Sequence, residues 1–273
     1  MANSPEPDDI TAVPIDDGSV TVARWGQGPA EIVLLHDGLG SIAQWRGIPG
    51  SLAATTGRTV LAYDRPGHGA STPVPTGPWP TDWLHREADR FARLIDTVEV
   101  VADPLLVGHS DGGSIALIHA ATTHEPLRGV LTLAAHSWVE DTCYRAIEGM
   151  RANAGPIVVG LARDHTAADR IFEAWSGVWV SDPFQRWDIR PLLSTIRCPT
   201  LVAQGRQDEY APDSHAIETA AAIGQNGQHV LLDGVGHLLH HQDPDLVVGL
   251  IADFDRSLGH DRSTMSPPRG GIE

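Results

Sequence analysis

The clearest chemical signal lies in the stretch LLVGHSDGGSIALIHAA, residues 105–121. Ser110 stands between Gly108 and Gly112 in a G-x-S-x-G pattern, after a short apolar run and before a segment with helical spacing. A serine on a sharp strand-to-helix turn takes a strained backbone conformation, and glycines at these two positions avoid collisions with the neighbouring backbone. The turn exposes the hydroxyl beside the free N–H groups that begin the helix. The pattern predicts a nucleophile; the alternative is a tight structural turn with an incidental serine.

A serine hydroxyl is a weak nucleophile unless a base accepts its proton. Of the 14 histidines, His237 in LLDGVGHLLHH has the strongest claim, because it follows the last predicted strand, where a loop can reach back over the strand ends. We interpret His36 as a structural hydrogen-bonding residue, and His109 lies inside the turn itself. His240 and His241 give an H-x-x-H-H spacing, but no convincing further ligand set accompanies it, so we predict no metal.

The base in turn needs an acid that fixes its tautomer. Asp208 follows the apolar run TLVAQG, at the carboxyl end of a predicted strand, where sites form in open α/β sheets. Glu209 and Asp213 remain alternatives for this acid. We interpret Asp233, at the end of another strand, as structural.

An acyl-transfer site also needs two N–H donors for the oxyanion. We expect them from the backbone of Asp111, directly after the serine, and of Gly38 in the loop HDGLGS; the alternative for that loop is a glycine-rich turn. The carboxylate of Asp111 has a sufficient structural explanation, since a helix N-terminus favours negative charge. With Asp37 nearby, however, it would favour a substrate that carries an amine or several hydroxyl groups and would repel an anionic one.

These residues require a sheet whose strand ends meet. Short apolar runs predict strands, and amphipathic segments between them predict helices over 83–96, 112–123, 214–222 and 246–258. The alternation implies βαβ units and a mainly parallel, doubly wound α/β sheet. The predicted strand segments are SVTVARW, EIVLLH, TVLAYD, PLLVGH, GVLTLAA, TLVAQG and HVLLDG.

The predicted domain organisation is a core over residues 11–136 and 198–259, interrupted by a helical cap over 137–197. The polar, Pro- and Gly-rich ends, 1–10 and 260–273, are expected to be disordered tails. We expect three tryptophans of the cap to contact substrate, although such rings more often belong to a core. These are Trp138, Trp175 and Trp179.

The composition excludes several classes of protein. The formal net charge of −16 argues against binding nucleic acid or an anionic membrane. All 19 basic residues are arginine, which excludes Schiff-base and serine–lysine chemistry. Two cysteines, Cys143 and Cys198, are expected to be reduced and packed. The first residues show neither a basic nor an apolar leader region, which favours a cytoplasmic location.

The chain resembles the α/β-hydrolase family over nearly its whole length, and the order Ser110, Asp208, His237 is the order of that family. The turn DRPGHGAS, residues 64–71, and the acid loop from Asp208 to Pro212 also resemble the family's motifs. The loop HDGLG departs from the usual His-Gly and is locally similar to that of zearalenone lactonase. The strand-to-helix turn at Ser110, called the elbow below, has the sequence SDGG. It resembles the elbow of valacyclovir hydrolase, in which the acid after the serine recognises a substrate amino group.

Together, the residues and the resemblance predict a cofactor-free serine hydrolase that acts on a small ester, lactone or related acyl compound. Relatives that use Asp as nucleophile, the haloalkane dehalogenases and epoxide hydrolases, are disfavoured by Ser110. One alternative is a carbon–carbon bond hydrolase that acts on a diketone; such enzymes usually carry Asn where this chain has His109. Another is a ligand receptor without activity.

Overall fold

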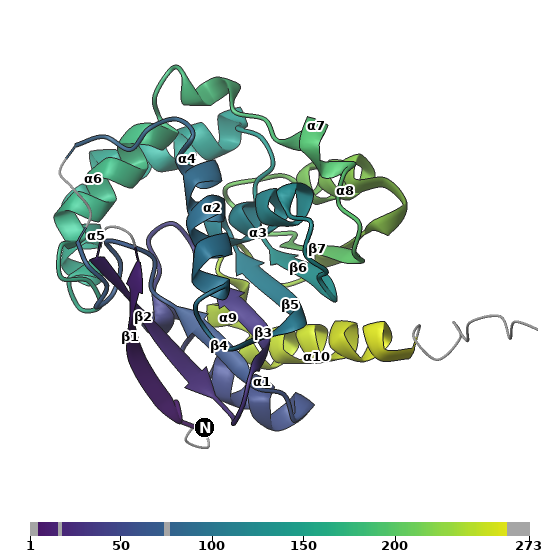
Figure 1. Ribbon diagram of the computed structural model, residues 1–273. Coiled ribbons are helices and arrows are strands. Elements are labelled where there is room, and N and C mark those ends of the chain that lie inside the picture. The colour runs from purple at the N-terminus through teal and green to yellow at the C-terminus, as the bar shows by residue number, and fades with distance from the viewer. Residues whose placement is uncertain (1–4, 16–17, 74–76, 261–273) are drawn as a thin grey trace, which may run out of the picture.

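The computed structural model describes residues 5–15, 18–73 and 77–260, and these form one eight-stranded sheet. The strand order is β1-β2-β4-β3-β5-β6-β7-β8; β1 and β2 run antiparallel to their neighbours, and the remaining strands pair in parallel (Figure 1). The predicted doubly wound, mainly parallel α/β fold is therefore confirmed. The strands are β1 (Asp9–Ile15), β2 (Gly18–Trp25), β3 (Ala30–Leu35), β4 (Val60–Tyr63), β5 (Val100–His109), β6 (Gly129–Leu133), β7 (Thr200–Gly205) and β8 (Gly227–Leu232).

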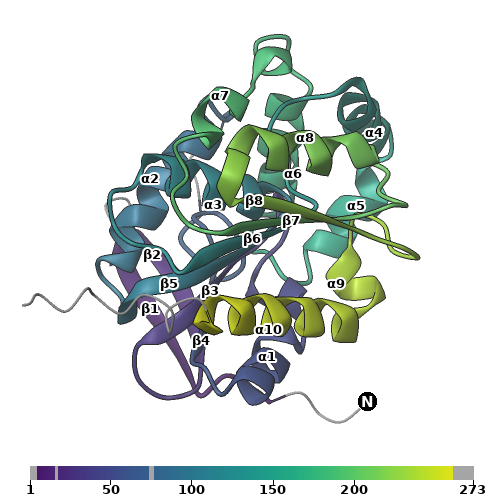
Figure 2. The same cartoon turned by 90° about the vertical axis from the view of Figure 1, so that its right-hand side faces the viewer.

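Helices cover both faces of this sheet. Figure 2 shows α1 and α10 side by side on one face, with α2, α3 and α8 on the other. Their bounds are α1 (Ile48–Thr56), α2 (Trp83–Ile95), α3 (Asp111–Thr122), α8 (Asp213–Ile223) and α10 (Pro244–His260). Shorter helical turns are η1 (Ile42–Trp45), η3 (Gly224–Asn226) and α9 (Leu239–Gln242).

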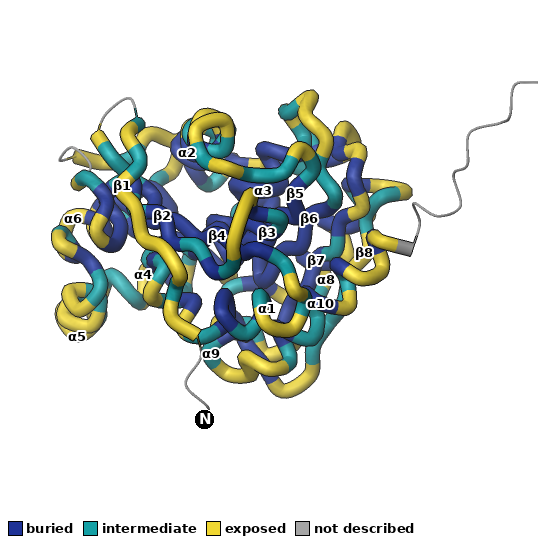
Figure 3. Tube along the Cα trace, turned by 60° about the horizontal axis from the view of Figure 1, so that its bottom comes forward, coloured by how far each residue is buried: buried dark blue, intermediate teal, exposed yellow. Residues whose placement is uncertain are grey.

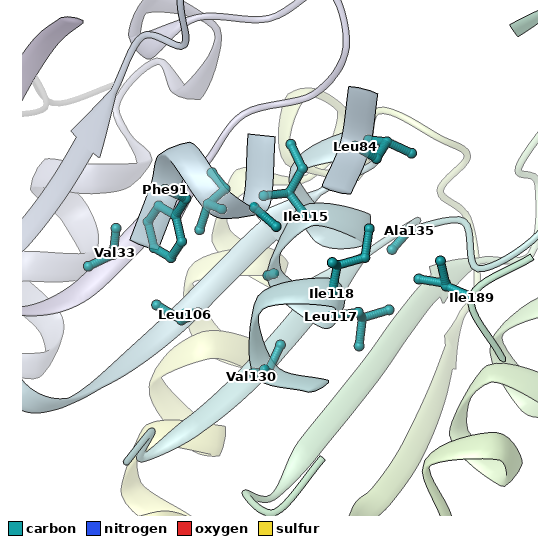
Figure 4. Close-up of a cluster of buried hydrophobic side chains, with 14 of the residues drawn as sticks. Val33, Leu84, Phe91, Leu106, Ile115, Leu117, Ile118, Val130, Ala135 and Ile189 are labelled. Carbon is teal, nitrogen blue, oxygen red and sulfur yellow. The ribbon is translucent and has the colours of Figure 1, made fainter. Parts of the chain in front are cut away.

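The core follows from strands that are apolar along their whole length, because helices bury both of their faces. The central strands are dark blue, and thus buried, in Figure 3. On the α2–α3 face, Phe91, Ile115 and Ile118 pack toward Leu106 and Val130 of the sheet (Figure 4). This packing anchors α3, the helix that begins directly after the candidate nucleophile.

A helical segment lies between β6 and β7, where the sequence predicts a cap. It contains α4 (Asp141–Ala152), α5 (Ala154–Leu161), α6 (Ala168–Trp179), η2 (Phe184–Arg186) and α7 (Arg190–Leu193). Helices α4, α5 and α6 lie together beyond the strand ends (Figure 1). The end of the predicted cap is different: α7 packs on α3 and α8, and Leu193 and Ile196 are buried in the sheet's own core. We therefore keep the name cap for residues 141–179.

The N-terminal segment differs from the disordered tail that the sequence suggests. Asp9 and Ile10 belong to β1, an edge strand that pairs with β2. The carbonyl of Pro5 accepts a 3.0 Å hydrogen bond from the indole of Trp25. Pairing and side-chain contacts thus order residues 5–10, while residues 1–4 and 261–273 lie outside the described residues.

The structure also bears on membrane insertion and on the state of the two cysteines. In the part of the chain that the structure describes, no helix is long and apolar enough to cross a bilayer. Cys143 and Cys198 are both free and buried, and burial raises the pKa of each thiol. Both thiols are therefore packed in their neutral form.

Candidate active site

Ser110 lies at the turn between β5 and α3. Its backbone has φ 51° and ψ −120°, a conformation that L-residues rarely adopt. A side chain at Gly108 would lie 2.3 Å from the carbonyl oxygen of Gly112, and one at Gly112 would lie 2.1 Å from that of Leu35. Only glycine fits these two positions, as the sequence pattern predicts, so the turn can bring Ser110 to the carboxyl edge of the sheet.

Three residues that the sequence singles out meet in one chain of hydrogen bonds. Ser110 Oγ lies 3.0 Å from Nε2 of His237, and Nδ1 of the same ring lies 3.1 Å from both carboxylate oxygens of Asp208. Because an ionised carboxylate only accepts hydrogen bonds, Nδ1 carries the proton. Nε2 is then the acceptor that faces the serine hydroxyl.

Burial and charge together set the protonation of this pair. Burial alone would raise the pKa of Asp208, but its contacts with His237 hold that pKa below the ordinary value. Burial favours the neutral ring of His237, yet Asp208 outweighs this effect and raises the pKa of the imidazole. Asp208 thus stabilises the imidazolium that forms when His237 accepts a proton.

The two alternative acids make other contacts. Glu209 accepts a 3.3 Å hydrogen bond from the backbone N–H of His237, not from its ring. Asp213 is the first residue of α8 and forms an ion pair with Arg206. Asp233 forms a second ion pair with the same arginine. Of these carboxylates, Asp208 is the one that contacts the imidazole.

The remaining candidate histidines have structural contacts. His36 donates from Nδ1 to the carbonyl of Asp37 and accepts at Nε2 from the backbone of Arg65. His109 donates to the carbonyl of His237, which ties the elbow to the histidine loop. His240 packs against Trp45, and His241 contacts the carbonyl of Gln44. Among the described residues, no three potential ligands gather as a metal site.

Side chains hold the main chain of the loop after β3 at each of four successive carbonyls. The buried guanidinium of Arg65 donates to the carbonyls of His36 and Asp37. His68 contacts the carbonyl of Gly38 at 3.0 Å, and His165 from the cap contacts that of Leu39 at 2.9 Å. Fixing the carbonyls also fixes the orientation of the intervening N–H groups, including that of Gly38.

Ser110, Asp111 and His237 open into a cavity of about 210 Å³ between the sheet and the cap. Asp37 and Gly38 line it from the loop after β3. The cap supplies a mostly apolar part of the remaining wall. It includes Cys143, Ile147, Met150, Leu161, Trp175 and Trp179.

The predicted substrate-contacting tryptophans divide into two groups. Trp175 and Trp179 line the cavity. Trp138 does not: it stacks on His215 at 3.7 Å between ring centroids, with the guanidinium of Arg190 on the ring. The expectation that Trp138 contacts substrate is therefore wrong, because stacking holds its ring against α8, outside the cavity lining.

Three carboxylates line this cavity, those of Asp37, Asp111 and Glu209, and the first two differ in their electrostatic state. Burial opposes the charge on Asp37, but contacts with His109 and further imidazoles hold its pKa well below the usual range. Burial raises the pKa of Asp111 to about 6, although Arg65 and a 2.8 Å hydrogen bond from the indole of Trp175 act in the opposite direction. Near neutral pH the mouth of the site therefore carries negative charge beside the serine.

Sequence reasoning missed three polar residues of the cavity wall, Gln44, His136 and Tyr210. His136 follows β6, at the same carboxyl edge of the sheet from which Ser110 and Asp208 come. That position is the signal that could have identified it. The ring of Tyr210 packs at a tilt against that of His237, with 4.4 Å between the ring centroids.

The mainly parallel sheet with a serine at the turn after β5 is the arrangement of the α/β hydrolases, and comparison with known families gives the same class. The model of the alpha/beta hydrolase family matches residues 32–250, and the chain belongs to this family. The mouse protein Serine hydrolase BPHL is 29% identical over 241 residues, covering 85% of this chain and 81% of the relative. The chain is thus similar over most of its length to a serine hydrolase.

Solved structures show the same fold at lower identity. The crystal structure of VinJ has a TM-score of 0.71 and 22% identity, and covers 93% of this chain and 100% of that one. The enol-lactonase from Burkholderia xenovorans LB400 has a TM-score of 0.68 and 23% identity, with 89% and 99% coverage. At these identities the likeness concerns the fold.

Proposed function

We propose that this protein is a serine hydrolase that cleaves small carboxylic esters or lactones through an acyl-enzyme. The observation that carries the proposal is the chain of contacts from Ser110 through His237 to Asp208, which opens into a cavity of substrate size. The arrangement contains the nucleophile, base and orienting acid that acyl transfer needs. No cofactor takes part in this chemistry.

In the proposed reaction, Ser110 Oγ attacks the substrate carbonyl carbon while His237 Nε2 accepts the hydroxyl proton. The backbone N–H groups of Gly38 and Asp111 stabilise the oxyanion of the tetrahedral intermediate. Collapse of the intermediate breaks the bond to the leaving alcohol, which takes the proton from His237. Water then repeats the sequence on the acyl-enzyme, so the acid is released and the serine is regenerated.

We further propose that the preferred ester carries a protonated amine. The carboxylates of Asp37 and Asp111 both line the cavity, and a carboxylate beside a developing oxyanion is unfavourable unless it binds a cation. The likeness of the elbow to valacyclovir hydrolase supports the same assignment for Asp111.

A matched pair of esters that differ only in an α-amino group tests this assignment. Asp111→Ala should lose kcat/KM for the amino ester and keep it for the neutral one. Equal losses on both esters would mean that Asp111 only supports the turn.

Covalent labelling tests the hydrolase itself. A fluorophosphonate should label Ser110 in a one-to-one ratio, and a p-nitrophenyl ester should give turnover that Ser110→Ala abolishes. Ser257→Ala, on the exposed face of α10, is the matched control and should keep both properties. A wild-type protein that binds small esters without labelling or turnover would instead be a ligand receptor.

A further inference from the structure

His136 is a buried imidazole in the cavity wall that the proposed reaction does not use. It follows β6 and lies 2% exposed. Its ring centroid is 6.0 Å from that of His237 and 5.5 Å from that of Trp179. The ring therefore lies between the catalytic histidine and the cap, on the surface that a bound substrate would touch.

The backbone around His136 is held on both sides. Ser114 Oγ donates a 2.6 Å hydrogen bond to the carbonyl of His136, and the backbone N–H of Ser137 donates to Nε2 of His215 at 3.0 Å. The ring packs edge-on against His215 and Trp179. These contacts fix the ring in place without using its polar atoms.

Neither ring nitrogen of His136 has a hydrogen-bond partner of normal length and angle within the described residues. The backbone carbonyl of Tyr210 lies beside the ring and raises the pKa of His136, an effect smaller than that of burial. Burial, with His215 and His237 nearby, holds the pKa of His136 well below its ordinary value. The ring is therefore neutral and presents one N–H donor and one lone pair. A buried polar group without a partner is costly, so such a group in a ligand cavity points to the ligand as its partner.

We propose that His136 is a specificity-determining residue that hydrogen-bonds an uncharged oxygen group of the substrate, a hydroxyl or a second carbonyl, beside the scissile ester. A neutral ring suits an uncharged partner, whereas an ammonium group would bind the carboxylates of Asp37 or Asp111. An anionic partner would meet the negative charge of these same carboxylates. The proposal rests on the proposed hydrolase function and adds a second polar contact to it.

The test compares esters that differ by one hydroxyl group. The first pair is p-nitrophenyl butyrate and its β-hydroxy analogue, which changes the acyl part. The second pair is the butyrate esters of propanol and of ethylene glycol, which changes the alcohol part. The enzymes are the wild type, His136→Phe, which keeps a ring without polar atoms, and His136→Gln, which keeps a donor and an acceptor.

In at least one pair, His136→Phe should lower kcat/KM for the hydroxy ester by roughly tenfold to a hundredfold relative to its partner. His136→Gln should recover part of this preference. The matched control is His119→Phe, which replaces another buried histidine that packs on Phe91 of the core and should leave the ratio unchanged. Equal loss on both members of each pair, or no change, would overturn the proposal.

Two further measurements separate this proposal from the hydrolase function. Fluorophosphonate labelling of Ser110 at the wild-type rate in His136→Phe shows that the reacting residues are intact. Calorimetric titration of Ser110→Ala with the same esters gives the hydroxyl preference as a ratio of Kd values, without turnover. If the wild type shows no turnover but binds hydroxy esters more tightly through His136, the inference about His136 stands and the hydrolase function is refuted. If the wild type turns over esters but shows no preference for the hydroxy esters, the hydrolase function stands and the inference about His136 is refuted.

Discussion

The indole N–H of Trp175, in the cap, donates a 2.8 Å hydrogen bond to the carboxylate of Asp111, the residue directly after Ser110. The carboxylate is buried, and a side chain at Gly38 would lie 2.3 Å from its Oδ2 atom. One hydrogen bond thus connects the cap to the turn at Ser110, and Gly38 of the loop after β3 lies directly against it. Because it lowers the pKa of Asp111, this contact also helps to keep the acid ionised.

Replacing Trp175 with phenylalanine should weaken the site for amino esters. The change removes the hydrogen bond and raises the pKa of Asp111 further, so less carboxylate is present near neutral pH. We expect kcat/KM for the amino ester to fall roughly tenfold relative to the neutral ester. Trp187→Phe is the control, since Trp187 stacks on Phe184 inside the helical segment. Equal shifts in the two variants would assign Trp175 to packing alone.

Asp208→Asn should fold normally and lose up to about 10⁴ in kcat, because an amide no longer selects the tautomer with a proton on Nδ1. Glu209→Gln changes the neighbouring carboxylate, which contacts the backbone of His237 rather than its ring, and should keep most of the activity. Steady-state kinetics with one neutral ester measure both. Near-full activity in Asp208→Asn together with a large loss in Glu209→Gln would reverse the assignment.

The activity on a neutral ester should rise with pH as His237 loses its proton. Asp208 raises the pKa of this imidazole above its ordinary value of 6.5. The protonated form is therefore retained to higher pH than in a free histidine, and the midpoint of kcat/KM should lie above 6.5. A pH profile of kcat/KM measures it. A midpoint below the ordinary value would mean that burial, not Asp208, dominates at His237.

The buried charge of Asp111 should reduce the free energy of unfolding at neutral pH. Its pKa is about 6 in the folded protein against 3.8 ordinarily, so the unfolded chain binds fewer protons between these values. Stability should then decrease as pH rises through this window and stay reduced above it. Asp111→Asn should stabilise the protein by about 2–3 kcal/mol at pH 7 and by little near pH 4.

Urea unfolding of the wild type and Asp111→Asn at the two pH values measures the difference. All other titrating groups are common to both proteins, so they cancel in the comparison. Equal stability changes at both pH values would show that the substitution acts through packing or through its hydrogen bond with Trp175.

The elements that the sequence predicts well are those whose pattern is local. The continuous apolar runs from β3 to β7 specify buried strands without reference to their partners. The edge strand β1, DITAVPI, has little apolar character and contains Pro14, and its order depends on pairing with β2. Helix α1 is apolar on most sides, so it lacks the amphipathic spacing that identifies a surface helix.

The same limit applies to the site. The three residues of the hydrogen-bonded chain follow strands whose carboxyl ends share one edge, so strand order was enough to group them. Trp138 and Trp175 are both tryptophans of the predicted cap, and nothing in the sequence distinguishes their roles. The tertiary fold decides that Trp138 stacks on His215 while Trp175 donates a hydrogen bond to Asp111. The unused nitrogens of His136 likewise depend on tertiary packing, which residue spacing does not encode.

His165 gives this architecture an evolutionary constraint. The residue lies between α5 and α6; its Nδ1 accepts from the backbone of Gly69, while its Nε2 contacts the carbonyl of Leu39. The cap therefore helps to hold the loop that carries Gly38, and it is not an interchangeable module. A chimera whose cap has no histidine at this position would have a new binding surface but would lose this support. Single substitutions on the cavity side of the cap would change the binding surface and keep this support, whereas exchange of the whole segment would keep it only where His165 is retained.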